Sequence, residues 1–510
     1  MNIFLYGPPG TGKSTIGKVL ARSLKLPLVD LDALIEAKAG LSIAQIMEQQ
    51  GEAAFRDLET STLEEAVGHA FSLTSKVFAL GGGALLRDEN RSLAETHGTV
   101  VLLTAVLPTL MERLQADAGK RPLLAGDLQE KLTTLLEQRK EHYASFPIRI
   151  KLDGLTAEQC AALIQTRLGR FHLSAMGEYE VVVGDMKQLA GLPYKLQNPV
   201  IVTDENVAQF HLEKIGSVLQ SLGHKPRTIV IPAGEDHKNL ETISLLWNAF
   251  LENGLDRKST VIALGGGVVG DMAGFAASTY MRGVDWICIP TTLLSMVDAS
   301  IGGKTGFDLP QGKNLVGSFY PPKLVLADVQ LLDTLPQREL LSGMAEVVKH
   351  GIISDPELFH LCACGWDWVR NNLEQVVKRA MAVKIKVIEE DPYERGFRAA
   401  LNLGHTVGHA VELVSKFELR HGEAIAVGLV VEARYAERIG IAEPGLSNTI
   451  ANVLSGYGLP VKVPESLPRE QILRAMRVDK KKQAKKIRFA LPAAIGEVQL
   501  VEVTDLEEVL

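Results

Sequence analysis

The sequence predicts two α/β units followed by a helical region, and three patterns point to this fold class. In the first third of the chain, short apolar runs alternate with helical patterns, as in a parallel sheet covered by helices. A second series of strands and helices runs to about Asp328, and the signal from about Pro336 onward is mostly helical. We therefore expect domains at 1–168, 178–335 and 336–510, with a linker at 169–177.

Each predicted strand is a short apolar run, and each predicted helix repeats apolar residues every three or four positions. The strands expected in the first unit are 2–6, 27–31, 76–80 and 99–104, and its helices are 14–24, 43–50, 107–115 and 155–168. Thr156 is in position to cap the last of these helices. The strands expected in the second unit are 179–183, 200–204, 228–232, 260–264 and 286–290. The later helices are 341–352, 373–390, 406–417 and 423–439.

Composition limits the kinds of protein that this chain can be. Its 510 residues are 46% hydrophobic and 23% charged, as in ordinary globular proteins. A net charge of −7 argues against nucleic acid or an anionic membrane as the main partner. No uncharged apolar run reaches about 18 residues, the start of the chain lacks a signal-peptide pattern, and the four cysteines include no C-x-x-C pair. We expect a soluble cytoplasmic protein with small-molecule partners.

A phosphate-binding loop is predicted at residues 7–14, where GPPGTGKS fits the pattern G-x-x-x-x-G-K-[ST]. Glycines lack a Cβ, so the backbone can curl around an anion, and the following helix adds its positive end. Lys13 would reach the terminal phosphates, and the Ser14 hydroxyl would join the Mg²⁺ shell. The residues assigned to the nucleotide are Gly10, Gly12, Lys13, Ser14 and Thr15. This end of the chain is expected to bind a nucleoside triphosphate.

Two aspartates, Asp30 and Asp32, follow the second predicted strand, at the sheet edge where open α/β folds bind ligands. One carboxylate could hold Mg²⁺ through water and the other could take a hydroxyl of the phosphate acceptor. The alternative is a pair of solvated acidic residues in a loop. Further signals are FRDLE at 55–59, the glycine triplet 81–83, KRP at 120–122, and Arg139. Arginines suit a carboxylate acceptor and the charge of a transferred phosphoryl group.

Together these motifs make residues 1–168 resemble shikimate kinase, which implies a nucleoside monophosphate kinase-like parallel sheet. The resemblance implies that Asp30 serves the metal, while Asp32 contacts the shikimate hydroxyls and takes part in catalysis. It also implies that Arg56, Gly82 and Arg139 hold the substrate, chiefly its carboxylate. Arg121 would reach ATP from a lid and would act with Lys13 in catalysis.

A second glycine-rich turn, GGGVVGD at 265–271, follows the predicted strand 260–264 and matches G-x-G-x-x-G. Alone this match is weak, because glycine triplets are common in turns. Neighbouring loops place Lys, Asn or hydroxyl groups beside glycine, namely GEDHK at 234–238, TT at 291–292, DASIGGKT at 298–305 and GKN at 312–314. The combination predicts a cleft for anions and a cofactor.

Residues of the types that bind metals gather in the helical region: Glu346, His405, His409 and His421. His405 and His409 are four positions apart and face the same way on a helix, so spacing alone assigns both to a metal. The alternative for a single helical histidine is an ordinary core or surface residue. The flanking polar residues are Lys349, Lys384, Arg398 and Asn402. So many cations imply an anionic substrate that chelates Zn²⁺ through oxygen.

Over residues 177–510 this pattern is similar to 3-dehydroquinate synthase, which implies a Rossmann-like α/β NAD domain and an α-helical metal-binding domain. The resemblance implies that Glu346, His405 and His421 bind Zn²⁺ or Co²⁺. It makes His409 a substrate and proton-relay residue, against the spacing argument. The residues implied for NAD are Asp204, Asn206, Glu235, Lys238, Gly266, Gly267, Asp271, Thr291, Thr292, Lys304 and Lys313.

The same resemblance implies a binding set for a phosphorylated sugar acid: Asp298, Lys304, Asn314, Lys349, Lys384, Arg398, Asn402 and Lys480, the last not distinguished from Lys481. Lys304, Lys384, Arg398 and His409 would also take part in catalysis. Arg282 resembles an arginine that a neighbouring subunit offers to the site, so a homodimer is implied.

The two resemblances imply a bifunctional enzyme of the shikimate pathway with two independent sites. One would phosphorylate shikimate to shikimate 3-phosphate with ATP and Mg²⁺. The other would convert 3-deoxy-D-arabino-heptulosonate 7-phosphate to 3-dehydroquinate and phosphate, with NAD recycled. One alternative joins another small-molecule P-loop kinase to a sugar-phosphate cyclase or a polyol dehydrogenase. Another is a kinase-like module that binds nucleotide only to regulate the synthase.

Overall fold

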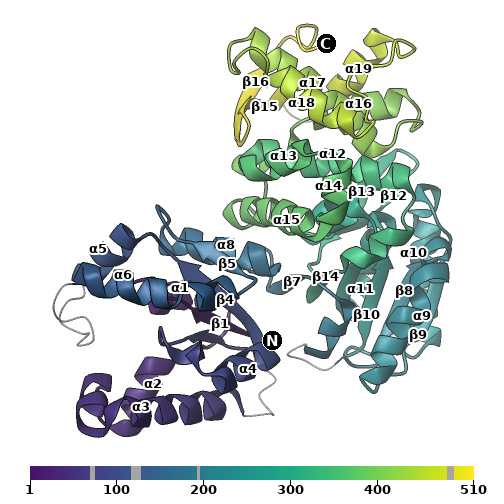
Figure 1. Cartoon of the computed structure of the whole chain (residues 1–510). Helices are drawn as coiled ribbons and strands as arrows, with labels where there is room; N and C mark the ends of the chain where they lie inside the picture. The colour runs from purple at the N-terminus through teal and green to yellow at the C-terminus, as the bar shows by residue number, and fades with distance from the viewer. Residues whose placement is uncertain (69–74, 117–127, 192–195, 479–486) are drawn as a thin grey trace. The chain divides into compact units, whose positions relative to one another are not determined.

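The computed structural model describes residues 1–68, 75–116, 128–191, 196–478 and 487–510. They form two compact units, one made mainly of Met1–His172 and the other mainly of Leu173–Leu510. Each unit builds its own central sheet (Figure 1). None of the helices in the described ranges combines the length and the hydropathy of a membrane-spanning segment.

A five-stranded parallel sheet in the order β2-β3-β1-β4-β5 forms the centre of the first unit. Its strands are β1 (Asn2–Tyr6), β2 (Leu28–Asp30), β3 (Val77–Ala79), β4 (Gly98–Thr104) and β5 (Arg149–Lys151). Its helices are α1 (Lys13–Ser23), α2 (Leu31–Ala39), α3 (Ile43–Val67), η1 (Ala84–Leu86), α4 (Asp88–His97), α5 (Leu107–Ala116), α6 (Leu128–Gln138), α7 (Lys140–Ala144) and α8 (Ala157–Leu168). The four predicted strands are confirmed, except that Leu31 begins helix α2.

Strand β1 contributes to a hydrophobic core on each face of this sheet. Phe4 and Tyr6 join one core with α2, α3 and α4, whereas Ile3 and Leu5 join the other with α1 and α8. Successive side chains of a strand point to opposite faces. A strand that is covered on both faces therefore reads as a continuous apolar run, which is how the sequence shows it.

A seven-stranded sheet has the order β6-β7-β14-β11-β10-β8-β9, and its strands from β7 onward belong to the second unit. Neighbouring strands from β7 to β9 in this order are parallel. The strands are β6 (Arg170–Leu173), β7 (Tyr179–Val183), β8 (Val200–Asp204), β9 (Arg227–Ile231), β10 (Thr260–Gly265), β11 (Asp285–Pro290) and β14 (Leu324–Ala327). The helices of this part are α9 (Glu205–Ser221), α10 (Leu240–Glu252) and α11 (Gly267–Thr279). Its short helical turns are η3 (Met186–Gly191), η4 (Glu235–His237), η5 (Tyr280–Arg282), η6 (Ser295–Ala299) and η7 (Val329–Thr334).

Strand β6 lies inside segment 169–177, for which a linker is predicted. Of its four residues only Phe171 and Leu173 are buried, so the run is too short to give a periodic signal. The boundaries of the linker and of the three predicted domains stay a prediction.

An antiparallel hairpin of β12 (Lys304–Leu309) and β13 (Gly312–Phe319) replaces what the sequence suggests are two separate loops. Its glycines hide the strand pattern, because they carry no side chain that could alternate. A Cβ on Gly306 would lie 2.4 Å from the Val316 carbonyl oxygen, so the close pairing requires glycine there.

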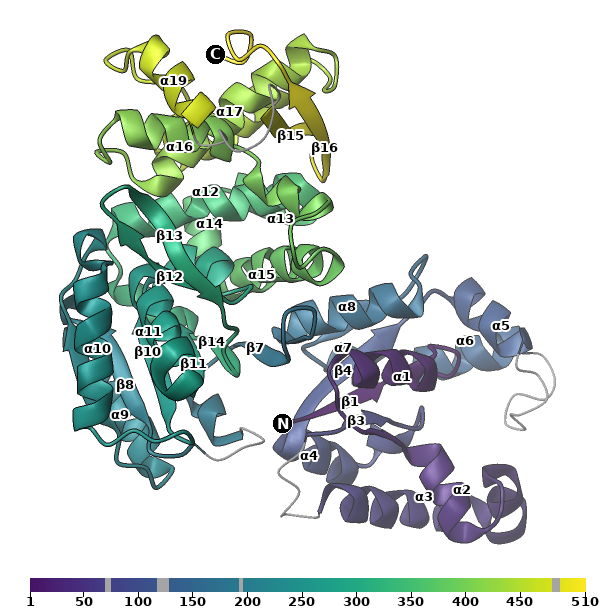
Figure 2. The same cartoon turned by 180° about the vertical axis from the view of Figure 1, so that it is seen from behind.

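The rest of the second unit is mainly helical, as Figure 2 shows from behind. Its helices are α12 (Gln337–Ser354), α13 (Pro356–Ala363), α14 (Trp366–Asn371), α15 (Leu373–Glu390), η8 (Phe397–Asn402), α16 (His405–Val414), α17 (His421–Arg438), α18 (Leu446–Gly456) and α19 (Arg469–Val478). The four predicted helices are confirmed within a few residues. The C-terminal hairpin of β15 (Ile487–Ala494) and β16 (Glu497–Val503) departs from the helical prediction.

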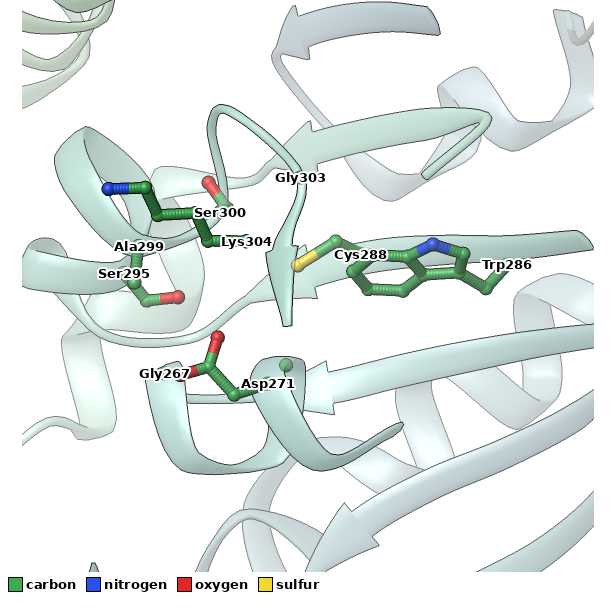
Figure 3. Close-up of a pocket in the computed structure, with 10 residues that line it drawn as sticks. Gly267, Asp271, Trp286, Cys288, Ser295, Ala299, Ser300, Gly303 and Lys304 are labelled. Carbon is green, nitrogen blue, oxygen red and sulfur yellow. The ribbon is translucent and has the colours of Figure 1, made fainter. Parts of the chain in front are cut away.

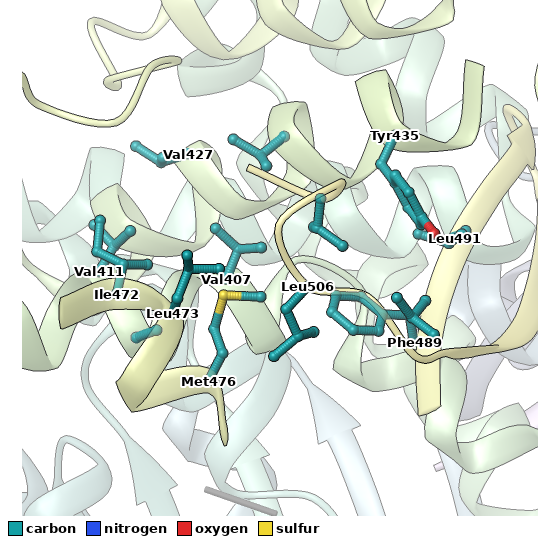
Figure 4. Close-up of a cluster of buried hydrophobic side chains, with 14 of the residues drawn as sticks. Val407, Val411, Val427, Tyr435, Ile472, Leu473, Met476, Phe489, Leu491 and Leu506 are labelled. Atoms are coloured by element: carbon teal, nitrogen blue, oxygen red, sulfur yellow. The ribbon is translucent and has the colours of Figure 1, made fainter. Parts of the chain in front are cut away.

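A hydrophobic cluster fixes helices α16 and α17 in this region. Val407 and Val411 of α16 and Val427 of α17 pack with α19, and Phe489 of β15 completes the cluster (Figure 4). Because this cluster holds one side of α16, His405 and His409 lie on a less buried side of the same helix.

Candidate active sites

The loop at 7–14 has the backbone that its glycines predict. Gly7, Gly10 and Gly12 adopt φ values of +144°, +84° and +77°, and residues that carry a Cβ disfavour these angles. A Cβ on Gly7 would lie 2.2 Å from the Leu103 carbonyl oxygen, so no larger residue fits. The loop therefore depends on glycine to curl between β1 and α1.

Lys13, Ser14 and Thr15 form the first turn of α1. The Lys13 ammonium donates to the carbonyl oxygens of Gly7, at 2.8 Å, and Pro8, at 3.1 Å. The backbone N–H groups of a first helical turn have no partner within the helix, and the helix dipole adds positive potential. This turn and its lysine therefore form a site that suits phosphate oxygens.

A second group of charges lies at the glycine turn 81–83. The Arg56 guanidinium pairs with Glu59 at 2.7 Å. A Cβ on Gly81 would lie 2.9 Å from both Asp32 Oδ1 and Glu59 Oε1, so the two carboxylates approach the same point. A Cβ on Gly83 would lie 2.7 Å from Arg56 Nη2. The side chains of Asp32, Arg56 and Glu59 therefore fit beside the turn only because its glycines carry no Cβ.

The predicted kinase residues divide into those that meet here and those that do not. Arg139 donates to the Gly82 carbonyl oxygen at 2.7 Å, so Asp32, Arg56, Gly82 and Arg139 lie around one turn. Asp30 instead caps α2 by accepting from the Ala33 N–H at 3.3 Å. Arg121 lies outside the described residues.

Glu59 ends the FRDLE motif, but the sequence prediction gave it no role in the site. Its carboxylate is fully buried, and among the described residues Oε1 accepts no hydrogen bond. Burial raises the pKa of Glu59, and the Arg56 guanidinium opposes this. The signal in the sequence was the spacing of Arg56 and Glu59, because residues three positions apart on a helix are neighbours.

In the second unit, a glycine turn joins β10 to α11. A Cβ on Gly265 would lie 2.5 Å from Val269 Cγ2, and one on Gly266 would lie 3.1 Å from Thr292 Cγ2. Gly266 is the N-cap of α11, so the positive end of this helix opens at the turn. Backbone packed this closely at a helix start is suited to a cofactor phosphate.

Three predicted cofactor and substrate residues form a hydrogen-bonded group beside this turn. The buried Lys238 ammonium donates to Asp271 Oδ2 and to Asn314 Oδ1, each at 2.7 Å. Burial raises the pKa of Asp271 although Lys238 opposes it, and the pKa of Lys238 is raised because Asp271 outweighs its burial. Lys313 lies 3.5 Å from Glu235, on the same hairpin as Asn314.

The predicted residues Asp204 and Asn206 lie at the same sheet edge, since Thr203 pairs in register with Leu264. Asp204 caps α9 by accepting from the N–H groups of Asn206 and Val207 at 2.9 Å. The Thr291 hydroxyl is buried and makes no hydrogen bond within the described ranges.

Figure 3 shows a cavity next to the glycine turn, lined by Gly267, Asp271, Cys288 and Lys304 among others. Its volume is about 10 Å³, room for about one water molecule. We therefore regard it as a packing gap and not as a dinucleotide site.

Glu346, His405 and His421 come from three helices, α12, α16 and α17, and their ligand atoms lie within 4.8 Å of one another. Glu346 Oε1 is 3.6 Å from His405 Nε2 and 3.5 Å from His421 Nε2. Glu346 is fully buried and neither oxygen accepts a hydrogen bond from a described residue, although the Lys349 ammonium is in ion-pair contact. One carboxylate with two imidazoles fits a Zn²⁺ site that keeps a position open.

The other ring nitrogens of the two histidines face hydrogen-bond acceptors. His405 Nδ1 lies 3.1 Å from the Leu403 carbonyl oxygen, and His421 Nδ1 lies 3.3 Å from Glu412 Oε2. His409 is exposed, with its ring centroid 5.0 Å from that of His405. It groups with Glu412 and His421 rather than with Glu346.

Charge and burial set opposite pKa shifts inside this cluster. Burial would raise the pKa of Glu346, but the Lys349 ammonium and the histidines hold it well below its ordinary value. Burial and the Lys349 ammonium hold the pKa of His405 well below its ordinary value. The pKa of His421 is raised to about 9, because Glu346 and Glu412 outweigh its burial.

Predicted substrate residues surround the cluster. The Lys384 ammonium donates to Asp298 Oδ1 at 2.6 Å, and it lowers the pKa of Asp298 against the effect of burial. Burial lowers the pKa of Lys384 itself. Lys349 donates to the Leu401 carbonyl at 2.8 Å. These buried ammonium groups would favour an anionic ligand.

Glu394 is a second residue that the sequence prediction missed. Its carboxylate accepts from Asn402 Nδ2 at 2.8 Å and lies 3.7 Å from the Lys304 ammonium. Arg398, which is buried, donates to the Pro392 carbonyl oxygen. The carboxylate therefore contacts two predicted substrate residues.

Glu432 was also missed, and it holds the start of α16. Its buried carboxylate accepts from the N–H groups of Gly404, at 2.6 Å, and Val407, at 3.3 Å. These N–H groups flank His405, so a residue of α17 fixes the first turn that carries this histidine. The available signal was a single glutamate within the apolar stretch 424–433.

Arg282 lies in the exposed turn η5 and has φ +70°, after Met281 at φ +49°. Lys480 lies outside the described residues.

Comparison with known proteins agrees with the division into two units. Models described as 3-dehydroquinate synthase N-terminal and C-terminal match residues 228–342 and 343–482. A protein named 3-dehydroquinate synthase from Shewanella halifaxensis is 42% identical over 329 residues, which are 62% of this chain and 89% of that protein. The chain belongs to the 3-dehydroquinate synthase family. A second relative of this name, from Symbiobacterium thermophilum, is 44% identical over 331 residues, 63% of this chain and 92% of that protein.

The first unit lies outside these synthase matches and has its own family. A model described as shikimate kinase matches residues 9–168. The chain therefore joins a shikimate kinase domain to a 3-dehydroquinate synthase, and both belong to the shikimate pathway.

Solved structures of related cyclases match the synthase part. A 2-deoxy-scyllo-inosose synthase in complex with carbaglucose-6-phosphate, NAD⁺ and Co²⁺ has 26% identity and a TM-score of 0.59, covering 66% of this chain and 96% of that one. A 2-epi-5-epi-valiolone synthase from Streptomyces hygroscopicus, with NAD⁺ and Zn²⁺ bound, has 29% identity and a TM-score of 0.59, covering 65% and 94%.

Proposed function

We propose that the chain catalyses two reactions. The first unit phosphorylates shikimate with ATP and Mg²⁺. The second converts 3-deoxy-D-arabino-heptulosonate 7-phosphate to 3-dehydroquinate and phosphate with NAD⁺ and Zn²⁺ or Co²⁺. The observation that carries the second proposal is the meeting of Glu346, His405 and His421 in one buried cluster.

In the kinase unit, Lys13 would leave the carbonyl oxygens of its loop to contact phosphate oxygens, while Ser14 and Asp30 serve Mg²⁺. Arg56 and Arg139, held at the glycine turn, would bind the shikimate carboxylate. Asp32, beside them, would orient the attacking hydroxyl and accept its proton. The neighbouring Glu59 keeps the Arg56 guanidinium in place.

In the synthase unit, the glycine turn and the Lys238–Asp271 pair would hold NAD, while Glu346, His405 and His421 would hold the metal. When bound, the two groups supply hydride transfer and an acidified substrate alcohol. Lys384 and Arg398 would orient the anionic substrate, and Lys304 and Asn314 would bind its phosphate. His409 and Glu394 would move protons during phosphate elimination.

The proposal is tested with the purified full-length chain. Shikimate and ATP should yield shikimate 3-phosphate, and the heptulosonate phosphate should release inorganic phosphate and form 3-dehydroquinate with catalytic NAD⁺. If the chain does not phosphorylate shikimate but does phosphorylate another small alcohol, the assignment of the first unit as a shikimate kinase is wrong.

Other sugar phosphates should be tested in the same assay of the second unit, because the two structural neighbours are cyclases with other names. We favour the heptulosonate substrate because the relatives named 3-dehydroquinate synthase share 42–44% identity, against 26–29% for those neighbours. Phosphate release from glucose 6-phosphate, with none from the heptulosonate, would overturn this choice.

We also propose that the protein works as a homodimer in the cytoplasm, with Arg282 offered to the partner's site. The exposed position of Arg282 supports this. Sedimentation of the wild-type chain and of Arg282→Ala, with activity measured on both, tests it. A fully active monomer would overturn the proposal.

A further inference from the structure

Helix α16 carries a third polar residue on the side that bears the two histidines. His405, His409 and Glu412 occupy positions i, i+4 and i+7, which share one face of a helix. The Glu412 side chain is 13% exposed, so most of it is withdrawn from water. The roles proposed above make no use of this carboxylate.

Both oxygens of Glu412 have cationic or donor neighbours. Oε2 lies 3.3 Å from His421 Nδ1, and Oε1 lies 3.6 Å from the Lys313 ammonium. Lys313 also lies over the Phe417 ring at 4.3 Å, which restrains its ammonium near Glu412. The carboxylate is therefore held between His421 of α17 and a lysine of strand β13.

The contact with Nδ1 decides what the other nitrogen of His421 can do. A carboxylate accepts, so Nδ1 of His421 keeps its proton, and the ring that binds an ion gives up the proton on Nε2 and offers the lone pair of that atom. Nε2 is the atom that lies 3.5 Å from Glu346 Oε1. The Leu403 carbonyl oxygen contacts Nδ1 of His405 in the same way, so the two histidines are oriented by different acceptors.

We propose that Glu412 is a positioning residue for the metal site: it fixes the ring of His421 and the tautomer that offers Nε2 to the ion. This rests on the metal site of the proposed function. Carboxylate partners of metal-bound histidines make the ligand more basic, and their loss costs about 10–100-fold in metal affinity.

The test measures zinc affinity of the full-length chain by competition with a chromophoric chelator, using the metal alone. Glu412→Gln keeps the size of the side chain and removes its charge. We expect its zinc affinity to fall by about 10–100-fold. The visible absorption of bound Co²⁺ should also shift, since it reports ligand geometry. Glu418→Gln, an exposed glutamate near the end of α16, is the matched control and should match the wild type.

Three outcomes would overturn the inference or its basis. Equal zinc affinity and Co²⁺ spectra for Glu412→Gln and Glu418→Gln would rule out a positioning role. If Glu346→Gln retains full affinity while His409→Gln loses it, the ion binds between His409, Glu412 and His421, and Glu412 is a direct ligand. A wild-type chain that binds no zinc contradicts the proposed function itself.

If Glu412→Gln does not fold, Glu412→Asp replaces it, since the charge is kept while the carboxylate is withdrawn by one methylene. We expect a measurable affinity loss there, smaller than the loss for a missing partner. Wild-type affinity would overturn the inference in the same way.

Discussion

At the glycine turn of residues 81–83, the absence of side chains decides where charged groups can lie. Asp32 and Glu59 both come within 2.9 Å of the position that a Cβ on Gly81 would occupy, and Arg56 comes within 2.7 Å of the corresponding position on Gly83. Two carboxylates that close repel each other, and Arg56 offsets the repulsion through its pair with Glu59. The acceptor site therefore depends on residues that carry no chemistry of their own.

Replacing Gly83 by Ala tests this dependence. The new methyl group would lie 2.7 Å from Arg56 Nη2, so the guanidinium must move away from its place. We expect the KM for shikimate to rise by about tenfold, as for the loss of about one charged hydrogen bond. The KM for ATP should change little. Initial rates at varied shikimate check this, with synthase activity of the same preparation as the control. An unchanged KM for shikimate would mean that Arg56 does not bind the substrate.

Glu59 gives a prediction about pH. Its pKa is raised by burial, so as pH rises above the ordinary value the unfolded chain loses this proton before the folded chain does. The free energy of unfolding therefore falls as pH rises through the window between the ordinary and the raised pKa. In Glu59→Gln this fall should be absent. Calorimetry of the full-length chain from pH 4.5 upward, following the transition that shikimate shifts, measures it.

Glu48→Gln is the matched control, because Glu48 is an exposed residue of the same helix, α3. Its pH profile should follow that of the wild type. A Glu59→Gln profile that cannot be told from the control would show that Glu59 titrates normally.

At the scale of elements, close packing of α16 on α17 brings two metal ligands together. A Cβ on Gly428 of α17 would lie 1.9 Å from the Gly404 carbonyl oxygen, at the start of α16. Glu432, one turn further along α17, caps that same start. The separation of His405 and His421 is thus set by a backbone contact and a buried carboxylate, and not by the histidines themselves.

Gly428→Ala should force the two helices apart, because the methyl group meets backbone and not a flexible side chain. We expect a loss of about 1–3 kcal/mol in the free energy of unfolding and weaker zinc binding. Gly216→Ala in helix α9 is the control, since nothing lies within 4 Å of its added Cβ. That variant should gain about 0.5–1 kcal/mol. Denaturant titrations compare the two, and equal stabilities would refute the packing argument.

Elements with a strong period were predictable from the sequence, and short or glycine-rich ones were not. Helix α15 has the predicted bounds Leu373–Glu390, and it shows a clear apolar side. The β12–β13 hairpin was missed because Gly306, Gly312 and Gly317 interrupt any alternation. Its lysine and asparagine were noticed as chemistry, without the strands that position them.

The same limit applies to the candidate sites. Histidines, lysines and glycine turns are visible in a sequence because their spacing forms motifs. The sequence gives only weak signals for Glu59 and Glu432 and none for Glu412, and burial is what distinguishes them, since a glutamate in a helix is most often solvated. Some of their partners are far away in the sequence: Gly404 is 28 residues from Glu432, and Lys313 is still farther from Glu412.

For the whole molecule, the kinase residues that the structure describes all lie in the first unit, and the described synthase residues all lie in the second. Neither candidate site borrows a described side chain from the other unit. We therefore expect each reaction to proceed when the other site is disabled. The domain boundaries at 168, 178 and 335 remain a prediction.

The most direct measurement of this central claim assays both reactions in two full-length variants, Lys13→Ala and His405→Ala. Lys13→Ala should lower shikimate phosphorylation by at least about 100-fold and leave phosphate release from the heptulosonate unchanged, and His405→Ala should do the reverse. Loss of both activities in either variant, or retention of the supposedly disabled one, would contradict the account of two separate sites.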